Sequence, residues 1–392
     1  MPLSTIVVGG GIGGLSLARE LGLAGLPVVV LERASKLATV GAGIIMNPNA
    51  MAVLEANGLA SCVRSRSSAY LARDTFDHRG RRLATRDYRP LYAEGRLAIG
   101  ALCHRAHLHE CLYDGLPAGT VRLDTRIVTL AAEPDGVRVE TESGEVFTAD
   151  VLVGADGIRS TVRARFFGPN EPTYLGYRSH RFVVPNVDGL EYFTEFLGHG
   201  KRVGLVPIGG GQLYVWTTFN SSPGSRAWAL ESVEALQGLF GKLTDPRVQR
   251  AFGELTSTDG VVCTDIEEVR LAAWARGRVA LLGDAAHALT PNMGQGAGMA
   301  MEDAAVLAEE LSRASRSETD LPHALTRYVA RRQRRVETIV RLSREIGEEG
   351  QLTGALACWL RNRRIRREGR SPARRTRAAL ERLLAWPPRE TA

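Results

Sequence analysis

The feature that most constrains the fold is a glycine-rich turn near the N-terminus. Residues 5–9 read TIVVG, an apolar run of strand type, and the following glycines lead into a helical segment at 12–24. Between a strand and a helix, such glycines permit a tight turn, close approach of the backbone to a pyrophosphate, and close helix–strand packing. The free N–H groups at the helix start then face the phosphates. The spacing of Gly9, Gly11 and Gly14 therefore predicts a dinucleotide-binding unit.

An acidic residue closes the second strand of this unit. Residues 27–32 read PVVVLE, a continuous apolar run typical of parallel sheets that are covered on both faces. Glu32 follows Gly14 by 18 residues, a spacing at which a carboxylate suits the ribose diol of a dinucleotide. We therefore place Glu32, with its neighbour Arg33, among the cofactor-binding residues. The alternative is a turn that is merely structural.

The character of the sequence changes along the chain. Buried strand-like runs return at 151–157 and 278–283, short alternating strands rich in aromatic residues fill 174–220, and long helices follow from 294. This order predicts an α/β fold: a Rossmann-like domain (GR2-type) assembled from discontinuous segments, an inserted antiparallel β-sheet domain and C-terminal helices. The expected bounds are 1–75, 98–170 and 265–350 for the nucleotide-binding domain, 76–97 and 171–264 for the substrate-binding sheet domain, and 351–392 for the Arg-rich C-terminal helices.

The positive charge is concentrated at the C-terminus. The net charge is +7, and residues 361–392 hold eleven Arg and three Glu, so the rest of the chain is almost neutral. No nucleic-acid-binding face is therefore expected on the body, and the tail is expected to be a solvated helix, with a weak membrane-surface or polyanion contact as the alternative. No run of 18 apolar residues occurs, so we expect no membrane span. The N-terminus lacks the cationic start of a signal peptide, and we expect a cytoplasmic monomer or homodimer.

The cysteines and histidines give no expectation of a metal site. The five cysteines (62, 103, 111, 263 and 358) are scattered, without a CxxC pair or Cys/His metal spacing. This pattern predicts reduced thiols. The histidines at 104, 107 and 109 do not share one helical face well, so we expect them on a solvated helix.

Two further strand–turn motifs carry an aspartate after a glycine. They are VLVGADGIRSTVR at 151–163 and GRVALLGDAAHALTPNMGQG at 277–296. With the first turn, and in this order over roughly residues 4–340, they resemble the single-component FAD-dependent aromatic hydroxylases (class A flavoprotein monooxygenases). The stretches at 198–204 (GHGKRVG), 287–304 and 358–362 (CWLRN) resemble the branch that hydroxylates 2-alkyl-4-quinolones at position 3. Salicylate and hydroxynicotinate hydroxylases are similar across the core motifs.

The resemblance implies roles for individual residues around bound FAD. The first turn would hold the pyrophosphate, Glu32 the adenosine ribose, and Asp284 the ribityl hydroxyls. Asp156 lies in the motif associated with FAD and the nicotinamide cofactor, and Arg105 matches an arginine that contacts the flavin. The helix start near Gly294 would direct N–H groups at the flavin pyrimidine ring, which is negative once reduced. The implied cofactor-binding set also includes Gly43 and Ile44 of the loop beside the isoalloxazine, Gly296 and Ala297.

The candidate catalytic residues are Gln295 and Pro291. Gln295 would contact substrate or flavin, or be only a polar residue at a helix start, and His287 would support its loop rather than act as a base. Candidate substrate contacts are taken from the aromatic stretch at 174–216: Tyr214, Trp216 and Phe196.

The resemblance implies chemistry in which NADH or NADPH reduces FAD and O2 forms a C4a-hydroperoxyflavin that hydroxylates an electron-rich phenol, hydroxypyridine or quinolone-type ring. An alternative is a flavin-dependent oxidoreductase on the same scaffold without oxygen insertion. A second alternative is a non-enzymatic binding protein that uses the basic tail. A halogenase is disfavoured because the sequence has no WxWxIP pattern.

Overall fold

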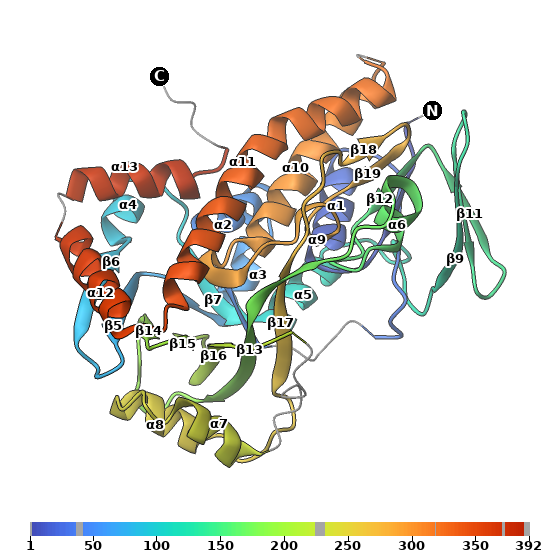
Figure 1. Ribbon diagram of the computed structural model, residues 1–392. Helices are drawn as coiled ribbons and strands as arrows, with labels where there is room; N and C mark the ends of the chain where they lie inside the picture. Colours follow the sequence, from blue (N-terminus) through green and yellow to red (C-terminus); the bar gives the residue numbers. More distant parts are fainter. Residues whose placement is uncertain (1, 37–41, 224–231, 318, 371–372, 388–392) are drawn as a thin grey trace.

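The computed structural model describes residues 2–36, 42–223, 232–317, 319–370 and 373–387, and of 373–376 only the backbone. The loop expected beside the isoalloxazine reads GAGI at 41–44, and its first residue, Gly41, lies outside the described residues. Two large sheets organise the chain, one mainly parallel and one mainly antiparallel (Figure 1). The expected α/β fold with an inserted antiparallel sheet is confirmed.

The first sheet has six strands in the order β18-β19-β12-β1-β2-β8. All neighbours are parallel except the edge pair β18–β19. Its central strands are short runs of Val, Ile and Leu with both faces buried, as expected for a parallel sheet between two layers. The strands are β1 (Thr5–Val8), β2 (Val28–Leu31), β8 (Val121–Arg122), β12 (Val151–Gly154), β18 (Ala275–Arg276) and β19 (Val279–Leu281).

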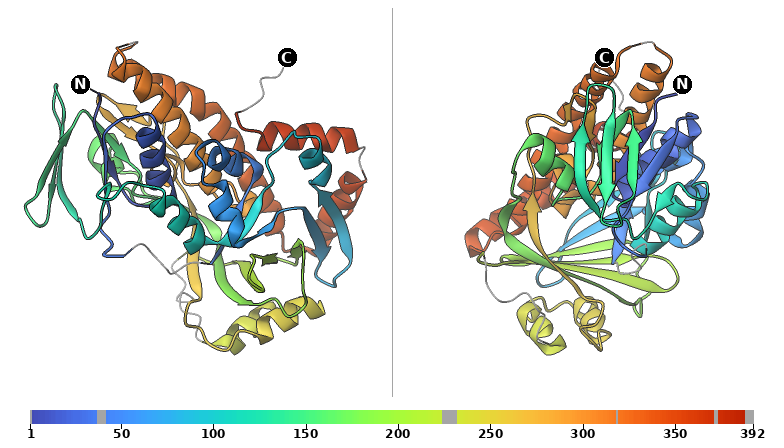
Figure 2. Two further views of the ribbon diagram at one scale, coloured as in Figure 1. Left: turned by 180° about the vertical axis from the view of Figure 1, so that it is seen from behind. Right: turned by 90° about the vertical axis from the view of Figure 1, so that its right-hand side faces the viewer.

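Helices and a small sheet bury this parallel sheet. Its core joins strand residues such as Ile6 to helix residues such as Leu17 and Leu311, and to Leu130 and Val139 of a three-stranded sheet. Figure 2 shows that small sheet at one end of the molecule. The elements are α1 (Ile12–Leu23), α6 (Thr161–Phe167), α9 (Asp284–His287), η1 (Pro291–Met293), α10 (Gly296–Ser315), α11 (Leu321–Gly350), β9 (Ile127–Ala132), β10 (Val137–Thr141) and β11 (Val146–Ala149).

The second large sheet has seven strands in the order β17-β13-β16-β15-β14-β5-β6. Every pair is antiparallel except β14–β5. Two helices cover one face through an apolar core that contains Phe196, Phe240 and Phe252, and the other face is turned toward the parallel sheet (Figure 1). The elements are β5 (Ala72–Asp77), β6 (Arg82–Asp87), β13 (Thr173–Pro185), β14 (Phe193–Leu197), β15 (Lys201–Pro207), β16 (Gln212–Asn220), β17 (Val262–Glu268), α7 (Val233–Phe240) and α8 (Pro246–Gly253).

The strands of a short three-stranded sheet, β3-β7-β4, come between β2 and β8 of the first sheet in the chain order, and helices follow β3 and β7 directly. Pro48 occupies the first turn of α2, where its missing N–H costs nothing. The elements are β3 (Gly43–Met46), β4 (Ser67–Ala69), β7 (Ala101–His104), α2 (Pro48–Ala56), α3 (Ala60–Ser65), α4 (Arg89–Ala93) and α5 (Arg105–Asp114).

The C-terminal helices are fastened to the body, contrary to the expectation of a solvated tail. In α12 (Ala355–Gly369), Cys358 and Arg361 are buried. In α13 (Ala373–Leu384), Leu380 and Leu384 join an apolar cluster with Tyr70. Apolar residues recur periodically in these Arg-rich helices and pack on the body. The arginine side chains can lie beside them, because their apolar stems cover apolar surface while their charged heads stay in water. No helix in the described ranges combines the length and apolar character that a membrane span needs.

Candidate functional site

One cavity of about 800 Å³ receives residues from all three glycine turns and from the seven-stranded sheet. Gly11 and Gly13 come from the first turn, Gly157 from the second, and Asp284 and Gly294 from the third. Gly11, Gly157 and Asp284 follow the carboxyl ends of neighbouring parallel strands, where open α/β sheets bind their ligands. The turns expected to share one ligand therefore do share one cavity.

Gly9, Gly11 and Gly14 of the first turn have different structural roles. Gly9 has φ +105°, and a Cβ there would lie 2.5 Å from the Ala155 carbonyl oxygen. A Cβ on Gly14 would lie 2.0 Å from the Gly9 carbonyl oxygen. These two glycines therefore allow backbone packing. A Cβ on Gly11 would meet nothing within 4 Å, and no side chain caps the N-terminus of α1 at this residue. The open space and the uncapped N–H groups fit a diphosphate.

Glu32 fastens the first turn from the end of β2. Its Oε2 accepts a hydrogen bond from Gly10 N at 2.7 Å, and its Oε1 accepts one from Ala34 N at 2.8 Å. Neither Glu32 nor Arg33, whose side chain is exposed, lines the cavity. His109 holds the same turn, because its Nε2 lies 2.8 Å from the Gly10 carbonyl oxygen.

The histidines near α5 are not on a solvated helix, so that expectation was wrong. His107 is buried and its Nε2 lies 2.8 Å from the Cys62 carbonyl oxygen. His104 caps α5 by accepting from Ala106 N. Burial lowers the pKa of His104 and of His109. Helical spacing missed this, because the partners of these rings come from other segments.

In the second turn, Asp156 caps α6. Its Oδ2 accepts hydrogen bonds from Thr161 N at 2.7 Å, Thr161 Oγ1 at 2.8 Å and Val162 N at 3.2 Å. Asp156 itself does not line the cavity, although its neighbours Ala155 and Gly157 do. Arg163 of the same motif donates to the Ala285 carbonyl oxygen at 3.1 Å, which ties the second turn to the third.

Asp284 of the third turn lines the cavity, and so does Arg105 at the start of α5. Both side chains are exposed at this cavity. Desolvation raises the pKa of Asp284, while the charges of His287 and Arg105 oppose that shift. Desolvation lowers the pKa of Arg105, with Asp284 opposing. Among the described residues, no group hydrogen bonds to either side chain, so both side chains can bind a ligand in the cavity, such as a polyol or a heterocyclic ring.

The start of α10 is also open toward the cavity. Gly294 has φ +61°, no side chain caps the helix, and Gly296 and Ala297 line the space. Pro291 lines it too. Gln295 does not, because its fully buried amide is bonded to Asn49. The structure thus places Gln295 behind the cavity wall.

Gly43, from the loop expected beside the flavin, packs against Tyr214 of β16. A Cβ on Gly43 would lie 2.4 Å from the ring of Tyr214, so only glycine fits there. Ile44 follows it along the cavity wall.

Side chains alternate between the two faces of a strand, so some of the candidate aromatic residues line the cavity and another lies in the core. Tyr214 and Trp216 of β16 line the cavity. In β14, Phe193 lines the cavity, whereas Phe196 lies on the opposite face, fully buried and stacked on Phe76. The structure therefore brings Phe196 to the core and not to the cavity. The sequence reasoning missed Tyr70, Phe193, Arg73 and Arg181.

A buried ionic network, also missed, lies behind the third turn. Asp303 accepts from His287 Nε2 at 2.6 Å, Gly283 N at 3.0 Å and Arg332 Nε at 2.8 Å. Its neighbour Glu302 accepts from Arg332 Nη1 at 2.6 Å. The sequence did contain a signal for this network: Glu302 and Asp303 are adjacent in a helix of small apolar residues. Carboxylates buried in such a helix need charged partners.

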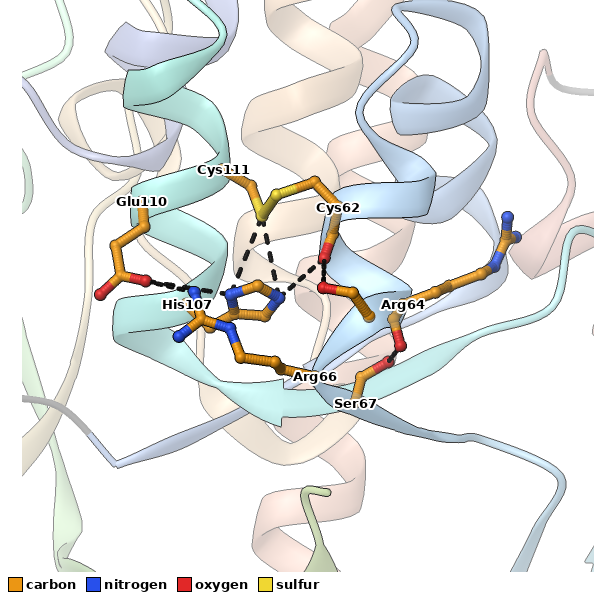
Figure 3. Close-up of a disulfide and its surroundings, with 8 residues drawn as sticks. Cys62, Arg64, Arg66, Ser67, His107, Glu110 and Cys111 are labelled. Carbon is orange, nitrogen blue, oxygen red and sulfur yellow. Dashed lines mark hydrogen bonds and ion pairs between the residues drawn. A yellow bond between two sulfur atoms is a disulfide. The ribbon is translucent and has the colours of Figure 1, made fainter. Parts of the chain in front are cut away.

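A disulfide joins Cys62 of α3 to Cys111 of α5, which corrects the expectation of reduced thiols. Figure 3 shows the bridge beside His107, and ligand atoms of the three residues lie within 4.8 Å of one another. Local spacing in the sequence could not reveal this cluster, because two packed helices bring together cysteines that are 49 positions apart. The two sulfurs are bonded to each other, and a disulfide does not supply the thiolates that metals bind.

The fold and the cavity define an α/β protein that holds an extended dinucleotide cofactor between two sheets. The chain matches the family described as FAD binding domain over residues 3–343, and it belongs to that family. Its cofactor is FAD.

Relatives of known name are similar over almost the whole chain. The aurachin C monooxygenase/isomerase of Stigmatella aurantiaca is 38% identical over 370 residues, 93% of this chain and 94% of the relative. The 2-heptyl-3-hydroxy-4(1H)-quinolone synthase of Pseudomonas aeruginosa is 33% identical over 376 residues, again 93% and 94%. The crystal structure of HpxO from Klebsiella pneumoniae, complexed with FAD and uric acid, has a TM-score of 0.86 at 26% identity, covering 97% of this chain and 96% of that chain. The expected resemblance to class A hydroxylases is confirmed.

Proposed function

We propose that this protein uses FAD, O2 and NADH or NADPH to hydroxylate an electron-rich aromatic or heteroaromatic small molecule. One observation carries the proposal: the cavity that receives the three cofactor turns continues onto aromatic side chains of the seven-stranded sheet. Such a cavity can hold a planar ring against the cofactor. A cytoplasmic location follows from the proposed reductant, which cells supply there.

A quinolone-type ring is the substrate class that we favour. Two relatives at 38% and 33% identity are named for quinolone or aurachin chemistry. Tyr70, Phe193, Tyr214 and Trp216 offer ring faces in the cavity, and aromatic pairs favour offset or edge contacts with a bound ring. Arg73 and Arg181 also line the cavity, and each guanidinium carries several N–H donors. These donors suit the oxygen of a ketone or phenol.

The residues of the chain would divide the work of holding the cofactor. When bound, FAD supplies hydride acceptance and activation of O2. The N–H groups at Gly11 would hold its diphosphate, Asp284 would accept from its ribityl hydroxyls, and Arg105 would lie against the flavin. The uncapped start of α10 would stabilise negative charge on the pyrimidine ring. Glu32 and Asp156 would act by shaping their turns, since their oxygens already hold backbone N–H groups.

We propose a matching division of the chain into domains. The segments 1–75, 98–170 and 265–350 would form the FAD-binding domain, and 76–97 and 171–264 the substrate-binding sheet domain. The pairing of β5 (Ala72–Asp77) with β14 supports a sheet domain that begins a few residues earlier than 76. Residues 351–392 would brace both.

Oxygen insertion is the measurement that tests the proposal. The FAD-loaded protein is supplied with NADH or NADPH under ¹⁸O2 and with a panel of alkylquinolones, phenols and hydroxypyridines. We expect one ring class to accelerate nicotinamide oxidation and to gain one ¹⁸O atom. Ring-stimulated nicotinamide oxidation with no ¹⁸O in any organic product, the labelled oxygen appearing only in peroxide or water, would instead identify an oxidoreductase that does not insert oxygen. A protein that retains no flavin after FAD is supplied would refute both.

A further inference from the structure

The outer face of α12 exposes a cluster of large apolar side chains. Leu356, Trp359 and Leu360 are 70%, 53% and 51% exposed. Their spacing of three and four residues places them on one side of the helix. The other large apolar residues with high exposure are separated in the sequence: Leu23, Ile99, Val128, Val146 and Val187. We call Leu356, Trp359 and Leu360 the α12 patch.

The inner face of α12 fixes the direction of this patch. Cys358 Sγ donates to the Leu352 carbonyl oxygen at 3.2 Å, and Arg361 Nη2 donates to the Gly198 carbonyl oxygen at 3.1 Å. A Cβ on Gly369 would lie 2.9 Å from Ala84 Cβ, so the end of the helix lies directly on β6. Figure 1 shows α12 at the edge of the molecule. Because the inner face of α12 packs on the body of the protein, the α12 patch points away from it.

Arginines continue the same face toward the C-terminal end of the helix. Residues 355–370 contain six Arg and one Glu. Arg363 lies over the Trp359 ring, with 5.5 Å between its Cζ and the ring centroid. Within the part of the chain that the structure describes, no carboxylate pairs with Arg363, Arg367 or Arg370, and all three side chains are exposed. The face thus combines an apolar turn with unneutralised positive charge.

We propose that the α12 patch docks on an anionic lipid surface, with the helix lying in the plane of the interface. Helices of this kind bury Trp and Leu at the boundary of headgroups and acyl chains, while Arg remains among the lipid phosphates. Charge selects this occupant over a second copy of the chain. In a two-fold dimer through the patch, the α12 patch of one copy would contact the α12 patch of the other. The arginines of both copies would then lie close together, and like charges across an interface are unfavourable.

Vesicle binding tests this inference without turnover, so it stands apart from the proposed function. The FAD-loaded full chain is sedimented with vesicles of phosphatidylglycerol and phosphatidylcholine, or of phosphatidylcholine alone. We expect binding to the anionic vesicles that falls with added salt. The double variant Leu356→Ser/Trp359→Ser and the double variant Arg363→Gln/Arg367→Gln should each bind at least about tenfold more weakly. Retained FAD and an unchanged melting temperature establish that each variant is folded.

The matched control is Leu23→Ser/Val128→Ser, which removes two exposed apolar residues elsewhere. It should bind vesicles like the wild type. Absence of binding to anionic vesicles by the wild type, or an equal loss in the control, would overturn the proposal. So would a dimer detected by light scattering that Trp359→Ser disrupts while vesicle binding is unchanged.

Discussion

The side-chain amides of Asn49 and Gln295 hydrogen bond to each other in both directions. Asn49 Nδ2 donates to Gln295 Oε1 at 2.9 Å, and Gln295 Nε2 donates to Asn49 Oδ1 at 3.2 Å. Asn49 Nδ2 also donates to Glu302 Oε1 at 2.8 Å. Since Gln295 precedes the first residue of α10, this pair sets the position of the helix start that faces the cavity.

Replacing Asn49 should therefore disturb the flavin site from behind. In Asn49→Ala, the Gln295 amide loses its buried partner, at a cost of about 1–3 kcal/mol, and the start of α10 shifts. We expect FAD to bind up to about tenfold more weakly and its visible absorption to change. Fluorescence titration with FAD measures the affinity. The control Asn186→Ala removes a side chain that bonds Leu190 in the sheet domain, and it should leave both unchanged.

Asp284 should contribute to FAD binding at the expense of the stability of the cofactor-free protein. Its side chain opens onto the cavity, and the surrounding protein reduces its hydration and raises its pKa. A raised carboxyl pKa in the folded state lowers stability as pH rises through that pKa, and this loss is absent below the unfolded pKa. Asp284→Asn should thus melt at a higher temperature than wild type at neutral pH when FAD is absent, and equally at acidic pH. FAD should bind about ten- to a hundredfold more weakly, because hydrogen bonds to a charged acceptor are lost. Equal cofactor-free melting temperatures at neutral pH would contradict this account.

Local patterns predicted the parts of the site that a single turn determines. The spacing of Gly9, Gly11 and Gly14 predicted the tight turn between strand and helix. The position of Asp284 just after a strand predicted that it would lie at the cavity. What the sequence could not show depends on pairing between remote segments. Asn49 and Gln295 meet across 246 residues, and no periodicity links them. Composition alone suggested that Phe196 contacts the substrate. It lies in the core instead, because strand register decides which face of the sheet an aromatic residue occupies.

The two aromatic positions therefore separate substrate binding from folding. Trp216→Leu removes a ring from the cavity wall, so KM for the aromatic substrate should rise several-fold while FAD affinity holds. Phe196→Leu removes a ring stacked on Phe76 at a centroid distance of 5.4 Å, and it should lower stability by about 1–2 kcal/mol with KM unchanged. Steady-state kinetics and thermal melts of both variants check the pair. A rise in KM for Phe196→Leu alone would reverse the assignment.

Asp303 should stabilise the protein through its charge. Although burial opposes it, the charges of His287 and Arg332 hold the pKa of Asp303 at about 2. A depressed carboxyl pKa contributes stability that is complete above the ordinary value of 3.8 and is lost as pH falls toward 2. Asp303→Asn leaves the buried Arg332 without this partner and should cost about 3–5 kcal/mol at neutral pH. Denaturant melts against pH should show the difference between the two proteins shrinking below pH 3.8, and a constant difference would contradict the ionic role.

The disulfide should stabilise the packing of α3 against α5, the helix that begins at Arg105. It closes a loop across 49 residues, and a loop of that size restricts the unfolded chain enough to contribute about 2–4 kcal/mol. Cys62→Ser should lower the unfolding free energy of the oxidised protein by that amount and should match wild type once both are treated with a reductant. Peptide mapping after alkylation, with and without the reductant, identifies the Cys62–Cys111 pair. Equal stability of oxidised wild type and Cys62→Ser, with the pair present, would show that α3 and α5 are already held by packing around His107 and that the bridge adds nothing.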